Sequence, residues 1–269
     1  MLGELYKPKG LARETAQAVL EVKEPYAVNV ALGCSNGCGY CYGPCFIKKS
    51  REEWVKVRHP KLKPSTLVWR QLNNGLEPEG VFMSFLTDVF LKENRKETED
   101  TIECLADNDI RVATSSKLGV SQIVRPFDLR DGMTLVSLHH RFWQKWEPNT
   151  LHPLERIKIL EELSDLEAFT WSSMEPYPCS AIWKQDLTEL LEELKFVDLI
   201  VFGKWNYDKR ANTEQARQEY KENIEILRDF CKSNHVRLHV KSDTLKFVEG
   251  KVNTIKTEQK WSSQNKQKP

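Results

Sequence analysis

The sequence has no long apolar stretch. Its longest apolar run, Phe196 to Gly203, is interrupted by Asp198 and is far shorter than the roughly 20 residues that a membrane-spanning helix needs. The N-terminal residues mix charges such as Glu4 and Arg13 without an apolar core, so we expect no signal peptide. These absences exclude a membrane protein and predict a cytoplasmic one.

The sequence also has little net charge, but what it has is unevenly placed. The whole chain of 269 residues carries +1. Residues 42–75 hold eight Lys or Arg against two Glu, residues 244–269 hold six Lys against two Glu, and residues 76–243 are acidic. Such asymmetry can mark a face that binds anions. A solvated basic loop and a solvated tail would give the same pattern.

Three of the seven cysteines stand close together. Cys34, Cys38 and Cys41 follow the spacing C-x3-C-x2-C, and Gly37 and Gly39 let the chain bend between them. A disulfide is disfavoured in a chain without a secretory signal. Three thiolates can instead hold three corners of a cube of four irons and four sulfides, which leaves the fourth iron open. Structural zinc, which takes four protein ligands, and a reduced cysteine knot are the alternatives.

Cys45 follows four residues after the last of these cysteines. As a fourth ligand it would close the cluster. We expect it to pack beside the loop instead, because the three-cysteine set is already complete.

Alternating strand and helix patterns run through the rest of the chain. Strands are predicted at 26–33, 81–85, 111–114, 134–139, 168–172, 197–202 and 237–240. Helices are predicted at 12–21, 65–74, 96–108 and 120–125, from Pro153 on, near 187–194 and from Asn212 to Cys231. This alternation implies a parallel α/β sheet of six or seven β/α units. We divide the chain into an N-terminal segment 1–25, a domain 26–243 and a basic, partly disordered tail 244–269.

Polar side chains gather where the predicted strands end, which is where sites form in parallel barrels. They are Ser84, Thr87, Asp88, Ser115, Ser116, Lys117, Ser137, His139, His140, Glu175, Lys204, Asn206, Tyr207, Lys241 and Asp243.

Tyr40, one residue before Cys41, completes the pattern C-x3-C-x-aromatic-C. With it the sequence resembles the radical S-adenosylmethionine enzymes. The resemblance implies a partial (β/α)6 TIM-like barrel and a [4Fe-4S] cluster on Cys34, Cys38 and Cys41. In that superfamily the open iron chelates the methionine amino and carboxylate groups of S-adenosylmethionine, and one electron then yields a 5'-deoxyadenosyl radical. Tyr40 would lie against the adenine.

Within that superfamily the sequence is similar to the spore photoproduct lyase-like, or DNA repair photolyase-like, branch. The likeness runs from about Val28 to Asp243 through Ser50–Glu53, Ser84–Asp88, Trp146–Pro148, Glu155-Arg156, Met174–Pro176 and Gly203–Tyr207. It implies that Ser84 or Thr87, in one motif with Asp88, binds the methionine group of the cofactor. By the same likeness Lys117, next to Ser116, would meet its carboxylate, and Ser137 would lie near its ribose. Each Ser or Thr could instead cap a helix.

The sequence departs from the lyase in one respect. The lyase returns a hydrogen atom from a cysteine near its second-strand motif, whereas residues 83–89 contain no cysteine. Lyase activity is therefore not expected. Cys179 is a candidate hydrogen donor, with a plain loop cysteine as the alternative. Glu175 and Tyr207 are expected as catalytic residues, and Asn206 and Lys241 on the substrate side.

The leading hypothesis is thus a radical enzyme that abstracts hydrogen from an unidentified substrate, with nucleic acid as one candidate. It would need an electron donor such as flavodoxin or ferredoxin. The alternative is a nucleic-acid-binding protein in which the cluster is structural and the basic stretch 42–75 makes the contacts.

Overall fold

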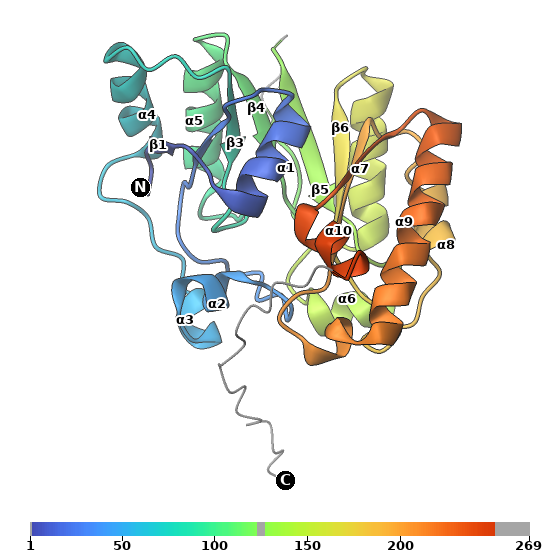
Figure 1. The fold of residues 1–269 in the computed structure, drawn as a ribbon. Helices are drawn as coiled ribbons and strands as arrows, with labels where there is room; N and C mark the ends of the chain where they lie inside the picture. The colour runs from blue at the N-terminus through green and yellow to red at the C-terminus, as the bar shows by residue number, and fades with distance from the viewer. Residues whose placement is uncertain (1, 123–126, 251–269) are drawn as a thin grey trace.

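Within the described residues, eight strands form one sheet, and their order in space follows their order in the chain. The computed structural model describes residues 2–122 and 127–250. The first strand is antiparallel to the second, and each later pair is parallel (Figure 1). The strands are β1 (Leu5–Tyr6), β2 (Tyr26–Val28), β3 (Gly80–Met83), β4 (Arg111–Thr114), β5 (Leu129–Thr134), β6 (Thr170–Tyr177), β7 (Leu199–Lys204) and β8 (Arg237–Val240).

Helices follow most of the parallel strands. They are α1 (Gly10–Leu20), α2 (Gly43–Ile47), α3 (Arg51–Trp54), α4 (Pro64–Asn73), α5 (Arg95–Ala106), α6 (His140–Trp146), α7 (Pro153–Asp165), α8 (Leu187–Glu192), the 3-10 turn η1 (Lys209–Asn212), α9 (Glu214–Asn234) and α10 (Ser242–Val248). Across residues 2–122 and 127–250, none of these helices combines the length and apolarity that a bilayer crossing demands.

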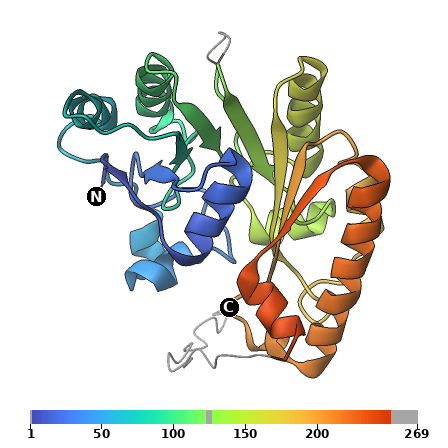
Figure 2. The ribbon, with the colours of Figure 1, turned by 45° about the horizontal axis from the view of Figure 1, so that its top comes forward.

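The sheet is curved, and its two faces are covered differently. Alternate side chains of a strand point to opposite faces. Val81 and Met83 of β3 therefore pack in one cluster with Ile102 of α5, while Phe82 packs in another with Leu20 of α1. Figure 2 shows α1 inside the curve of the strands, with α4, α5, α7 and α9 outside. The first helix thus fills part of the inner face.

Seven parallel strands in sequential order make an incomplete barrel. Within the described ranges, β8 pairs with β7 and the pairing does not continue to β1. The fold confirms the expected partial TIM-like barrel. The predicted strands at 111–114 and 237–240 are confirmed, and so is the apolar seam of α9 that includes Tyr220 and Leu227.

The strand predicted at 134–139 was wrong, because β5 ends where that strand was expected to begin. No strand was predicted over 129–133, where Arg130 and Asp131 stand, but the structure gives each of these two side chains a partner. Asp131 accepts a hydrogen bond from Thr114 at 2.5 Å, and Arg130 donates to Glu21 at 2.7 Å. A side chain on Gly132 would overlap the indole of Trp171. Apolar periodicity therefore misplaced this strand.

Residues 120–122 are not helical, and residues 123–125 of the predicted helix 120–125 lie outside the described residues. The helices α6 and α10 were not predicted. Helix α10 crosses the boundary expected at residue 243 and buries Thr244 and Phe247, so the folded unit extends beyond it. At the other end, β1 and α1 belong to the sheet and its inner layer. Residues 251–269 of the predicted tail are outside the described part.

Candidate active site

The three cysteines lie on the loop that follows β2, which we call the cluster loop (residues 29–42). Neighbouring segments fix its backbone. The N–H groups of Gly33, Cys34 and Gly39 donate to the carbonyl oxygens of Leu86, Trp54 and Trp146 at 3.0, 3.0 and 2.8 Å. The loop is therefore shaped by segments after β3, in α3 and at the end of α6.

Two glycines let these segments come close. Gly33 has φ +102°, and a Cβ there would lie 2.6 Å from the carbonyl oxygen of Trp54. A Cβ on Gly39 would lie 2.7 Å from the ring of Trp146. Both positions therefore require glycine. At Gly33 a side chain would be strained by the positive φ and would clash with Trp54, and at Gly39 it would clash with Trp146.

Arg51 holds the middle of the loop. Its guanidinium donates to the carbonyl oxygens of Cys38 at 3.0 Å and Gly39 at 2.6 Å. Ser50 and Glu53 form a capping box that starts α3 and so positions this arginine. The motif Ser50–Glu53 thus supports the cluster loop.

Cys38 is buried, and Cys34 and Cys41 are half-buried. Burial raises the pKa of Cys34 to about 12 and raises those of Cys38 and Cys41, and the charge of Cys41 acts on both Cys34 and Cys38. Backbone N–H groups approach Cys34 and Cys41, and the nearby Lys117 opposes the rise at Cys38 and Cys41. Buried thiolates with N–H donors and a cation beside them suit an iron–sulfur cluster, whose properties depend on such contacts.

The described side chains do not form a site for a single metal ion. In residues 2–122 and 127–250, no three His, Cys, Asp or Glu side chains are placed to share one ion. The closed zinc site allowed by the cysteine pattern is thus not formed by the described residues. The thiolates of a cube bind separate irons and stand farther apart than the ligands of one ion.

Asp88 organises the ends of β3 and β4. Its carboxylate accepts hydrogen bonds from the side chains of Asn36 at 3.0 Å and Ser116 at 2.6 Å, and from the N–H groups of Phe90 at 3.0 Å and Lys117 at 2.9 Å. Its two oxygens are therefore engaged by the protein. Asp88 and Ser116, which were expected to bind cofactor, join the cluster loop to two strands.

Ser84 and Thr87 lie beside this group. Ser84 is buried at φ +70°, and its hydroxyl donates to Asn29 at 3.4 Å. Thr87 accepts a hydrogen bond from Asn94 at 2.9 Å. The left-handed backbone at Ser84 is strained for a residue with a side chain, and strain of this kind gathers at functional sites.

A buried ion pair supports Tyr40. The Tyr40 hydroxyl donates to the carboxylate of Glu147, whose other oxygen pairs with the fully buried Arg156. The Tyr40 ring also meets Trp205 edge-on at 5.2 Å and lies 5.5 Å from the ammonium of Lys117. Burial opposes the charge of Lys117, but Cys38 and Glu147 raise its pKa, so it stays cationic beside the loop.

Glu175 and Tyr207 lie near Tyr42, at the end of the cluster loop. Glu175 pairs with Lys241 at 3.2 Å, and burial raises its pKa although Lys241 opposes the rise. Gly203 makes room for this pair, because a Cβ there would lie 2.8 Å from Glu175. Tyr207 is 52% exposed, and Glu175 contributes to the electrostatic surroundings of both Tyr207 and Tyr42.

Lys241 is not available to a substrate in this arrangement. Its ammonium also donates to the carbonyl of Leu11 at 3.1 Å and the hydroxyl of Thr15 at 2.6 Å, both on α1. Asn206 likewise accepts from Lys204 at 2.8 Å and donates to Asp243 at 3.1 Å. Both substrate-side candidates therefore hold elements together.

Two further candidates lie apart from the thiols. Ser137 is buried in the loop after β5 and accepts the N–H of His139 at 3.2 Å. Cys179 is buried in the core cluster that includes Tyr220 of α9, and its thiol contacts the carbonyl oxygen of Arg210 at 3.7 Å. The structure does not bring Cys179 together with Glu175.

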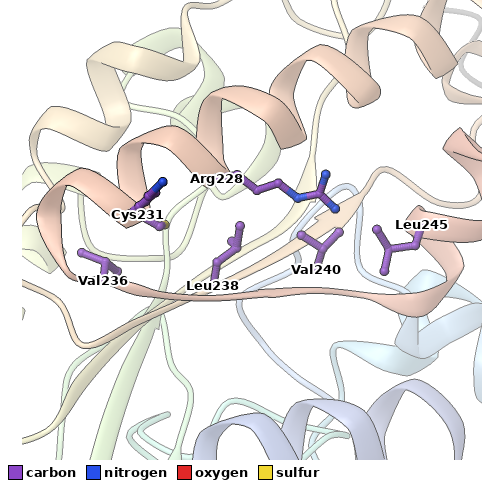
Figure 3. Close-up of a pocket in the computed structure, with 7 residues that line it drawn as sticks. Arg228, Cys231, Val236, Leu238, Val240 and Leu245 are labelled. Carbon is purple, nitrogen blue, oxygen red and sulfur yellow. The ribbon is translucent and has the colours of Figure 1, made fainter.

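The pocket in Figure 3 belongs to the outer face of β8. It is lined by Leu238 and Val240 of β8, by residues of α9 such as Arg228, and by Leu245 of α10. Lys241 bonds to α1 on the inner face instead. The pocket is therefore separate from the candidate site.

Sequence reasoning gave Arg51, Glu147 and Arg156 no role, although each lay in a quoted motif. A charged residue inside an otherwise recognisable motif was the available signal. Arg51 donates to Gly39, 12 residues away along the chain, and Glu147 bonds to Arg156, nine residues away, and to Tyr40, 107 residues away. Periodicity does not reveal contacts at such separations.

No family model matches the sequence, and no curated protein matches it. Solved structures do match. A mutant spore photoproduct lyase with bound AdoMet and dinucleoside spore photoproduct has a TM-score of 0.57 at 14% identity, over 80% of this chain and 76% of that one. SuiB of Streptococcus suis bound to S-adenosylmethionine has a TM-score of 0.59 at 11% identity, over 84% of this chain and 52% of SuiB. SuiB bound to its precursor peptide SuiA gives 0.57 at 10% identity, over 84% and 50%.

At these identities the likeness concerns the fold. It agrees with the resemblance that the cysteine motif suggested independently. The chain has the partial barrel fold of the radical S-adenosylmethionine enzymes spore photoproduct lyase and SuiB.

Proposed function

We propose that the protein is a radical S-adenosylmethionine enzyme whose [4Fe-4S] cluster is held by Cys34, Cys38 and Cys41. The observation that carries the proposal is the set of three cysteines on the loop after the first parallel strand of this barrel, with the cation Lys117 close to Cys38 and Cys41. The cluster and S-adenosylmethionine together would supply a 5'-deoxyadenosyl radical that removes a hydrogen atom from the substrate. The protein's own task is to orient both molecules and to exclude water.

Lys117 is our first choice for the cofactor carboxylate. It is a cation close to both Cys38 and the Tyr40 ring, and its backbone is fixed by Asp88. Thr87, Ser84 and Ser137 remain proposed contacts to the methionine group and ribose. We assign Asp88 and Ser116 a supporting role, because they bond to each other and to the loop.

Glu175 and Tyr207 are proposed to face the substrate. Cys179 is a weaker choice for hydrogen return, since its thiol is buried near α9 and contacts the carbonyl of Arg210. A cysteine that returns a hydrogen atom would have to come close to the cluster loop, where the radical would form.

Anaerobic reconstitution tests the proposal. The protein should bind about four irons per chain, and the electron paramagnetic resonance of its reduced form should change when S-adenosylmethionine is added. With dithionite it should yield 5'-deoxyadenosine. Cys34→Ala, Cys38→Ala and Cys41→Ala should each lose the cluster, whereas the matched control Cys45→Ala should keep it. A spectrum indifferent to S-adenosylmethionine would leave only the alternative of a structural cluster.

The exposed residues near the end of the cluster loop suggest a substrate with planar rings and negative charge. Tyr42, Phe46 and Tyr207 are 41%, 67% and 52% exposed. Lys48 and Lys49 are exposed at the end of α2. Exposed aromatic rings beside cations are the usual means of binding single-stranded nucleic acid. One structural neighbour is bound to a dinucleoside and another to a peptide, so both classes need testing.

Salt dependence distinguishes the two classes. If single-stranded nucleic acid binds, log K should fall linearly with log salt, with a slope near −0.7 per neutralised phosphate. The slope should become shallower in Lys48→Gln/Lys49→Gln. Arg51 should not be included, because it holds the cluster loop. If no binding is found at about 50 mM salt, nucleic acid is not the substrate.

A further inference from the structure

Residues 55–58, which pack against the cluster loop, include two cations that the proposed chemistry does not use. Segment 55–58 contacts the loop directly: Arg58 and Leu32 exchange backbone hydrogen bonds of 2.9 Å in both directions. The side chains of Lys56 and Arg58 are nevertheless exposed. Neither takes part in an ion pair with another residue of 2–122 or 127–250.

The same segment begins with an exposed apolar residue. Val55 is 38% exposed. Its methyl group would lie 3.8 Å from a Cβ built on Gly37, which sits between Cys34 and Cys38. Because Gly37 has no side chain, the exposed Val55 lies beside the backbone that joins Cys34 to Cys38.

We propose that Val55, Lys56 and Arg58 form the docking surface for an acidic one-electron donor protein, a reduced flavin or iron–sulfur protein. This inference rests on the proposed function, since it needs a cluster to reduce. In the step, the donor loses one electron and the cluster gains it, and no covalent bond forms or breaks. The negative surface of the donor would meet Lys56 and Arg58, and Val55 would lie at the centre of the contact.

Three features favour this partner. Electron-transfer contacts are small, often below 1,200 Å² in total, so a single exposed apolar residue with two cations is sufficient in scale. Charge complementarity raises the rate of encounter more than the final affinity. The segment also touches the loop at Leu32, Gly33 and Gly37, whereas Tyr42, Glu175 and Tyr207 mark the side where a substrate would enter.

Rates of cluster reduction test the proposal without requiring substrate or S-adenosylmethionine. The reconstituted protein is mixed anaerobically with a fully reduced, acidic flavodoxin, and bleaching of the cluster is followed by stopped flow. Lys56→Glu/Arg58→Glu should slow reduction about tenfold or more at 50 mM salt, within the range expected of electrostatic steering. At 500 mM salt the difference from the unmodified protein should largely disappear.

Two controls isolate the surface. Dithionite, a small reductant, should reduce the variant and the unmodified protein at equal rates. Lys221→Glu/Lys232→Glu makes the same change of charge on exposed positions of α9, and it should keep the flavodoxin rate within about twofold.

The proposal is overturned if flavodoxin reduces Lys56→Glu/Arg58→Glu at the normal rate, or if dithionite is slowed equally. It is also overturned if the variant loses binding of a single-stranded oligonucleotide but not its response to flavodoxin, which would assign the surface to nucleic acid. Failure of the proposed function is a separate result: the cluster would be reduced normally, yet no 5'-deoxyadenosine would form.

Discussion

Replacing Asp88 by Asn tests whether this residue organises the site. The amide keeps the shape of the carboxylate but turns one acceptor oxygen into an NH2 donor. One carboxylate oxygen of Asp88 accepts from Ser116 and Phe90, and the other accepts from Asn36 and Lys117. Hydroxyl and amide side chains can turn to accept a hydrogen bond, but the backbone N–H of Phe90 or Lys117 cannot.

In either orientation of the amide, one backbone N–H therefore loses its acceptor in a buried place. A buried donor left unpaired costs about 1–3 kcal/mol, and hydrogen bonds to a charged acceptor contribute about 1.5–3 kcal/mol each. Because these terms overlap, we expect Asp88→Asn to lower the free energy of unfolding by about 2–5 kcal/mol. Urea unfolding of the metal-free protein, followed by circular dichroism, measures this change.

The exposed Asp165 at the end of α7 gives the matched control. Asp165→Asn should change the free energy of unfolding by less than about 0.5 kcal/mol. Ser116→Ala should cost less in the Asp88→Asn background than alone, because the two residues share a hydrogen bond. If Asp88→Asn is as mild as the control, the four contacts do not organise the site.

Three further predictions concern buried charges. Lys117→Met should weaken S-adenosylmethionine binding tenfold to a hundredfold, as expected for losing a charged contact of about 1.5–3 kcal/mol, with iron content unchanged; equal affinity in equilibrium titration would remove Lys117 from the site. Glu147→Gln should destabilise the protein by about 3–5 kcal/mol by leaving Arg156 without its counter-charge, and the double variant with Arg156→Met should cost less than the sum of the single changes. Burial raises the pKa of Asp131 to about 7 from 3.8, so the folded protein holds a proton that the unfolded chain gives up, and the free energy of unfolding should fall as pH rises from about 4 to about 7. Asp131→Asn should flatten that part of the pH profile, and an unchanged slope would contradict the assignment.

The sequence alone determined the class of fold and the position of the cysteines within it. Sequence patterns located β4 and β8, and the helical spacing of apolar residues located the buried seam of α9. The spacing of Cys34, Cys38 and Cys41 indicated a three-thiol site, since ligands that close in sequence can converge through a short loop. These inferences needed only contacts between near neighbours in the chain.

Only the tertiary structure showed which of the polar residues already have partners within the protein. Asp88, Ser116 and Lys241 looked like cofactor or substrate contacts at strand ends, but each is engaged by partners from other elements. The charged strand β5 escaped prediction because Thr114 and Glu21, distant in sequence, provide partners for Asp131 and Arg130. Local pattern reports the chemistry that a side chain offers, whereas the packing of distant segments determines whether that chemistry is already used within the protein.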